Sequence, residues 1–209
     1  MACFTLRRTY LTAIFVLGFC GTINQVYGKQ PALADYVRIF RSLDQQSSLT
    51  ASNLVSASRN MENGVTDNKR ELDDLESSAK ANGDLLTMMR VTRLARSTSE
   101  ALICLSELQQ IAVGLQGDLH TLYFALSFTS LATSKFDQDT GLDFVRLQAD
   151  TTSGKLHVYR KTISGLSTCG NSTSWSNVIS SSSKITQAII DSSDQQIRFL
   201  SGSIGHSKY

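Results

Sequence analysis

The sequence of 209 residues contains a single proline, Pro31, and none follows it. Secreted domains built from β-strands have many turns marked by proline and glycine, so we do not expect this chain to be one. From Leu33 onward, apolar residues recur at steps of three and four, which is the spacing of amphipathic helices. We therefore predict an all-α fold, an antiparallel bundle of four to five long helices with short links.

The expected helix boundaries depend on local turn and capping signals. Asn63-Gly64 predicts a break near residues 62–67, although one continuous helix of about 60 residues is the competing interpretation. Ser97 and Glu100 have the spacing of a capping box, which predicts a new helix from about residue 98. The polar residues 133–141 predict a link between helices, and residues 202–209 predict a flexible tail.

The first 28 residues lack charge except at Arg7 and Arg8. The apolar run of residues 11–20 is too short to span a membrane, which takes about 20 apolar residues. A basic start, a short apolar run and small residues before Lys29 predict a secretory signal peptide over residues 1–28; the alternative is an uncleaved anchor. Cleavage would leave a secreted, extracellular protein with a single helical-bundle domain over residues 29–201 and the tail at 202–209.

Net charge is also lacking once the signal peptide is removed. Cleavage takes two of the 20 Lys and Arg residues and leaves 18, against 18 Asp and Glu residues. Proteins that bind nucleic acids usually present a basic surface, so we expect no nucleic-acid partner. A neutral chain is not strongly drawn to an acidic membrane surface either.

Cysteine is scarce, and two of the four, Cys3 and Cys20, would leave with the signal peptide. In an oxidising compartment the remaining pair, Cys104 and Cys169, predicts one disulfide. It would close a loop of about 65 residues and contribute about 4 kcal/mol. Two separate buried thiols or an intermolecular bridge are the alternatives. Asn171-Ser172-Thr173 is a sequon in a polar stretch, so Asn171 is a candidate for N-glycosylation.

The most apolar stretch past the N-terminus runs from Ala101 to Ala132. Charged and amide residues interrupt it, and its uncharged part is too short for a bilayer, so we predict a buried core helix and no membrane span. Tyr123, Phe124 and Phe128 lie in this helix. They could line an apolar pocket between helices, although such a set is more often ordinary core.

The usual catalytic and metal-binding patterns are lacking too. The three histidines form no metal-binding pair, the cysteines lack zinc spacing, and no Gly-x-Ser-x-Gly occurs. We therefore expect no enzyme activity, no metal and no cofactor.

One charged pattern stands out among the remaining residues. Arg90, Arg93 and Arg96 recur every three residues and would line one side of a helix. They predict either a patch for an anionic partner or favourable charges at the C-terminal end of a helix.

These observations favour a secreted, non-enzymatic bundle that binds a macromolecular partner. The alternative is an extracellular carrier of a small apolar, lipid-like ligand held between helices. The sequence does not indicate an oligomeric state.

Overall fold

Four helices make up the part of the chain that the structure describes. This computed structural model describes residues 32–166 and 176–206, without the side chains of 64–72 and 205–206. The helices are α1 (Leu33–Ala81), α2 (Leu85–Ser130), α3 (Lys135–Gly165) and α4 (Ser176–His206). No strand occurs within these ranges. The prediction of an all-α fold with packed helices is therefore confirmed.

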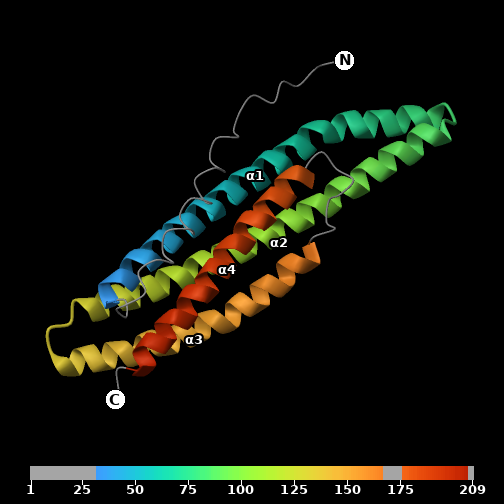
Figure 1. The fold of residues 1–209 in the computed structure, drawn as a ribbon. Coiled ribbons are helices and arrows are strands. Elements are labelled where there is room, and N and C mark those ends of the chain that lie inside the picture. Colours follow the sequence, from blue (N-terminus) through green and yellow to red (C-terminus); the bar gives the residue numbers. More distant parts are fainter. Residues whose placement is uncertain (1–31, 167–175, 207–209) are drawn as a thin grey trace. The chain divides into compact units, whose positions relative to one another are not determined.

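Each helix runs opposite to the one before it in the chain, and all four belong to one compact unit, Leu33–Tyr209 (Figure 1). Helix α2 packs against the other three, and α1 lies along much of its length. At 31 residues each, α3 and α4 are much shorter than α1 and α2, which have 49 and 46. The end of α1 and the start of α2 therefore project beyond α3 and α4 as a two-helix arm (Figure 1).

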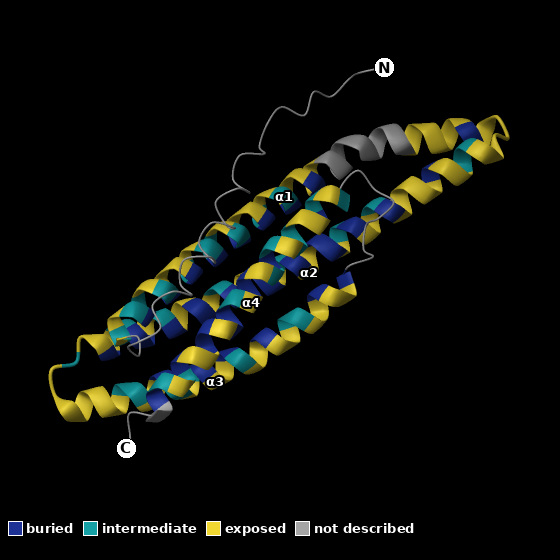
Figure 2. Ribbon diagram, viewed as in Figure 1, coloured by how far each residue is buried: buried dark blue, intermediate teal, exposed yellow. Residues whose placement is uncertain are grey.

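The spacing of apolar and small residues explains why α1 lies along α2. Buried α1 residues follow steps of three and four, as in a coiled-coil seam: Tyr36, Phe40, Leu43, Ser47, Ala51, Leu54, Ser58 and Met61. The facing part of α2 supplies the centre of the core, which is coloured dark blue in Figure 2. Its fully buried leucines are Leu105, Leu108, Leu115, Leu119, Leu122 and Leu126. The stretch from Ala101 is thus core, as predicted.

Several small hydroxyl residues are also buried in this core. The hydroxyls of Ser47, Thr129 and Ser193 each donate a hydrogen bond to a backbone carbonyl three or four residues earlier, at 2.9, 2.8 and 2.7 Å. A buried hydroxyl that is bonded in this way avoids the cost of an unsatisfied polar group. These residues are small, so the helix backbones can approach one another closely.

The predicted break at residues 62–67 is wrong, because α1 continues through them to Ala81. The chain reverses instead at Asn82-Gly83-Asp84, where Gly83 has a φ of +66°, a conformation that glycine adopts without strain. Asp84 caps α2 by accepting a hydrogen bond of 3.1 Å from the Thr87 amide. The competing interpretation, one continuous helix of about 60 residues, agrees better with the structure, but it does not predict the turn at residues 82–84.

The predicted capping box at Ser97 is also wrong. Ser97 lies inside α2, is buried, and donates its hydroxyl to the Leu94 carbonyl at 3.0 Å. The polar link before α3 is shorter than predicted, because Ser134 caps a helix that begins at Lys135. Helix α4 continues through residues 202–206, which we expected in the flexible tail, and Ile204 is buried.

Candidate interaction surfaces

The most buried charged cluster on α2 joins that helix to α3. Asp118 is buried and accepts hydrogen bonds from Lys155 Nζ at 2.6 Å and from Tyr159 Oη at 2.9 Å. Burial, together with this hydrogen bond to Asp118, raises the pKa of the Tyr159 phenol well above its ordinary value. The phenol therefore stays neutral and keeps donating, so the cluster acts as a clamp between two helices.

A second clamp joins α3 to α4. Arg160 donates to Asp191 at 2.9 Å and to Asp194 at 3.3 Å, and Arg198 donates to Asp194 at 2.9 Å. The hydrogen bond to Asp191 raises the pKa of the Arg160 guanidinium. Both clamps satisfy their charges internally, and neither leaves an acid or base directed at an open site.

An open hollow lies between α1 and α2, with Asp44, Ser48, Gln116 and His120 among its lining residues. His120 Nδ1 lies 3.2 Å from Asp44 Oδ2, while Ser48 Oγ pairs with Gln116 Nε2 at 3.4 Å. Nucleophilic catalysis needs the serine to bond the histidine, and here each has another partner. Among the described side chains, no group of three His, Cys, Asp or Glu residues is placed to hold a metal ion.

The first part of α2 carries the three arginines predicted as a patch. They lie on the projecting arm, so their alternative interpretation as charges near a helix C-terminus is wrong. Arg96 pairs with Glu100 at 3.0 Å. Arg90 and Arg93 form no ion pair with another described residue.

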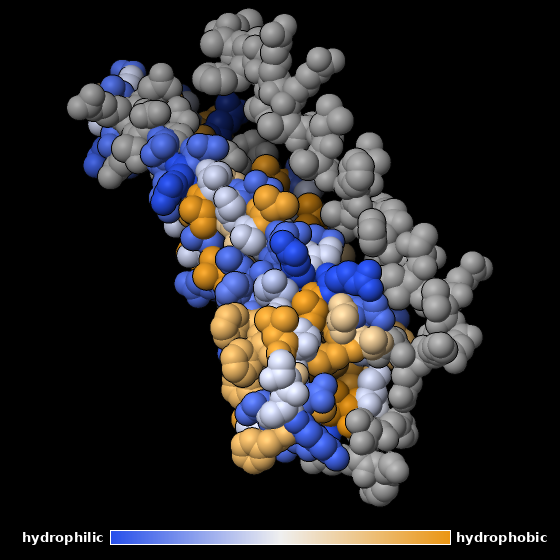
Figure 3. Space-filling model, turned by 90° about the vertical axis from the view of Figure 1, so that its left-hand side faces the viewer, coloured by the Kyte–Doolittle hydropathy of each residue, from blue (hydrophilic) through white to orange (hydrophobic). Residues whose placement is uncertain are grey.

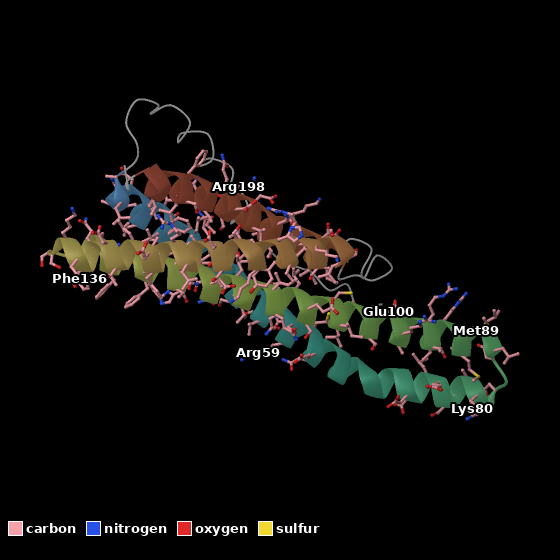
Figure 4. The ribbon with its side chains drawn as sticks, turned by 90° about the horizontal axis from the view of Figure 1, so that it is seen from below. Arg59, Lys80, Met89, Glu100, Phe136 and Arg198 are labelled. Carbon is pink, nitrogen blue, oxygen red and sulfur yellow. The ribbon has the colours of Figure 1, made fainter. Side chains whose placement is uncertain are left out.

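Large apolar side chains surround these arginines and are exposed. Met89, for example, is 69% exposed. We call this set the basic tip; it consists of Arg90 and Arg93 together with Leu75, Leu85, Leu86, Met89 and Leu94. Figure 4 shows Met89 and Lys80 at the end of the arm, where only α1 and α2 are present.

At the other end of α2, large apolar side chains again face outward. Phe124 and Phe128 are 63% and 67% exposed, so they lie on the outside of α2 and not between helices. Tyr123 is partly buried against the core. This placement does not provide the internal pocket that the sequence suggested for these three residues.

Exposed apolar residues on α3 continue this surface. Gly141 packs against Thr129, so α2 and α3 approach each other closely there. Each residue of a helix is rotated by about 100° about the helix axis relative to the one before it. Relative to the Gly141–Thr129 contact, this rotation places Phe128 on α2 and Phe144 on α3 on the same side of the helix pair, away from the core. We call the set the phenylalanine face; it consists of Phe124, Phe128, Leu131, Phe136, Phe144 and Leu147, all exposed. Figure 3 shows apolar side chains gathered in this half of the molecule, and Figure 4 shows Phe136 at its tip.

The edge of the phenylalanine face is acidic. Asp139, Asp143 and Asp150 lie on one side of α3, bordering the exposed apolar residues. Residues 135–150 contain four aspartates against Lys135 and Arg146, and Arg146 already lies 3.4 Å from Asp143. Both surfaces on α2 therefore share apolar character, and the α2 side of the basic tip carries arginines where the edge of the phenylalanine face carries aspartates. The acids of the arm lie at the N-cap of α2, Asp84, and on α1, at Asp73, Asp74 and Glu76.

The remaining predicted site residues cannot all be tested. Cys104 is buried on α2, and it is the only cysteine among the described residues. Its predicted partner Cys169 and the candidate glycosylation site Asn171 lie outside them, so both predictions stand untested. None of the described helices carries an apolar stretch that could cross a lipid bilayer.

Comparison with known proteins gives no match to a family model, a curated protein or a solved structure. The function must therefore be argued from these surfaces. The sequence predicted Arg90 and Arg93 as part of a binding patch. It also predicted Phe124 and Phe128 as site residues, but in the interior of the bundle. The signal that could have placed them outside is their position on α2, because they lie opposite the buried residues Leu119, Leu122 and Leu126.

Proposed function

We propose that this protein is a secreted, non-enzymatic helical bundle that acts by binding a macromolecular partner through the phenylalanine face. The expectation of secretion comes from the basic, then apolar, sequence of residues 1–28. Partner binding is supported by the surface of the bundle.

The exposure of three phenylalanines on one face carries the proposal. Phe128, Phe136 and Phe144 are between 51% and 79% exposed. Contiguous exposed apolar patches are uncommon on soluble monomers and usually mark interaction sites. Phenylalanine is also among the residues that are enriched in protein interfaces relative to the rest of the surface. Complete burial of an exposed ring contributes about 1.5–3 kcal/mol, so these rings are the side chains of this face with most to gain from being covered.

A carrier role for a small apolar ligand has less support. The aromatic residues that motivated it, Phe124 and Phe128, face outward, and the centre of the bundle is filled by leucines of α2. A ligand held between helices would need an enclosed apolar space. We therefore propose a macromolecular partner. The cross-linking experiment distinguishes such a partner from a small bound ligand.

Site-specific photo-cross-linking tests the proposal. A photoreactive phenylalanine analogue replaces Phe144 in the protein, which is then irradiated in the secreted fluid of its own source. The same analogue at Phe199, an exposed phenylalanine on α4, serves as the control. We expect a discrete adduct of protein size from position 144 and little from position 199.

Two results would overturn the proposal. One is the same adduct pattern from both positions, because a specific surface must react selectively. The other is only a small gain in mass at position 144, which would indicate a small apolar ligand instead of a macromolecule.

A further inference from the structure

The two exposed surfaces of α2 are complementary to each other. The basic tip offers leucines, a methionine and two arginines without ion pairs to other described residues, while the phenylalanine face offers aromatic rings beside aspartates. Apolar surface would meet apolar surface, and Arg90 and Arg93 would meet Asp139 and Asp143. Complementary charges of this kind fix the orientation and choice of partners.

These surfaces cannot meet within one chain. Met89 and Phe128 lie 39 positions apart on the same continuous helix, and a helix rises about 1.5 Å per residue, so they are about 58 Å apart. Figure 4 shows Met89 and Phe136 at opposite ends of the structure. Any contact between the two surfaces must therefore join different molecules.

We propose that the partner of the phenylalanine face is the basic tip of a second copy of this chain. This inference rests on the proposed function and names its partner. A symmetric dimer in which two phenylalanine faces meet would bring two aspartate edges together, which is unfavourable. The tip-to-face contact is heterologous, so a pair of copies keeps one unused tip and one unused face, and further copies can join in an open row.

The start of α2 is well suited to act as the inserted element. Leu86, Met89, Arg90 and Arg93 follow one another at steps of three, one and three residues and form an exposed apolar-then-basic stripe. Among the described helices, α1 alone accompanies this part of α2, so the tip is narrow. A narrow two-helix arm presents this stripe with no other described helix beside it.

Charge-swapped variants test the inference by sedimentation velocity over a range of protein concentrations. The tip variant carries Arg90→Glu and Arg93→Glu, and the face variant carries Asp139→Lys and Asp143→Lys. We expect the wild-type sedimentation coefficient to rise with concentration, and to rise less at high salt because salt screens the charges. Each variant alone should associate at least about tenfold more weakly, because like charges meet at every contact.

An equimolar mixture of the two variants provides the decisive comparison. Each contact in the mixture can pair opposite charges, so association should return to near the wild-type level. A control with Arg41→Glu and Arg59→Glu, two exposed α1 arginines, makes the same change in net charge as the tip variant and should associate like the wild type. Recovery in the mixture also shows that both variants are folded.

The inference is overturned if the wild type sediments as a monomer at all concentrations, or if the mixture does not recover. The proposed function itself fails only if position 144 shows no selective adduct of protein size. If position 144 cross-links to a protein of another mass while the wild type remains monomeric, the phenylalanine face has a foreign partner. In that case the proposed function stands and self-association is excluded.

Discussion

A close contact between α2 and α3 lies beside the phenylalanine face, and it depends on the absence of a side chain at Gly141. A Cβ atom at this position would lie 2.5 Å from Thr129 Oγ1 and 2.9 Å from Thr129 Cγ2. Thr129 is buried, and its hydroxyl donates to the Ala125 carbonyl at 2.8 Å. Burial and this hydrogen bond therefore both hold the threonine side chain in place.

The substitution Gly141→Ala has two opposing effects on stability. Alanine favours the helix over glycine by about 1 kcal/mol. Overpacking of a buried contact costs about 1–3 kcal/mol. At Gly154, on the same helix, an added methyl group would meet no atom within 4 Å, so Gly154→Ala should show only the favourable effect. We expect the two variants to differ by about 1–3 kcal/mol in their free energy of unfolding.

Urea denaturation followed by far-ultraviolet circular dichroism measures this difference. With a slope of about 2 kcal/mol per M, a difference of about 2 kcal/mol separates the two midpoints by roughly 1 M. Gly154→Ala should unfold at higher urea than the wild type, and Gly141→Ala at lower urea or near it. Equal stabilisation by both substitutions would refute the close contact between Gly141 and Thr129.

Two further predictions concern polar contacts that involve α2. Asp118→Ala leaves the partly buried Tyr159 hydroxyl without its acceptor, so we expect a loss of about 1–3 kcal/mol in urea denaturation. In ultraviolet titration the raised pKa of Tyr159 should fall toward its ordinary value of 10.0, and an unchanged titration would contradict the clamp. The hydrogen bond from the Thr87 hydroxyl lowers the pKa of the Asp84 carboxyl below 3.8, so the cap should support α2 above that pH and be lost as the pH falls through the lowered value. Asp84→Asn should remove this pH dependence of amide exchange at residues 85–88, and the same dependence in the variant would show that another group causes it.

The helical class was predictable from the sequence because the relevant signal extends over most of the chain. The absence of proline after Pro31 and the steps of three and four hold through every described helix. Boundaries rest on two or three residues and were harder to predict. Asn63-Gly64 and Asn82-Gly83 carry similar turn signals, and pairing of α1 with α2 decides between them, because only the second turn lets Met61 and Ala101 both reach the core.

The candidate surfaces were predictable only in part, because exposure depends on how far other helices extend. Leu86 and Met89 continue the apolar spacing of the chain, which by itself would place them against a core. In the structure they are exposed, since α3 and α4 do not reach the arm. The periodicity of a helix indicates which side is apolar, but it does not indicate whether another helix covers that side.

Carbene footprinting with mass spectrometry measures directly whether a partner covers the phenylalanine face. The protein is labelled in the secreted fluid of its source and again after purification and dilution. We predict that Phe128, Phe136 and Phe144 are labelled much less in the undiluted fluid, while Phe199 on α4 is labelled equally in both. Equal labelling of all four phenylalanines under the two conditions would contradict the account, because it would show that nothing covers the phenylalanine face.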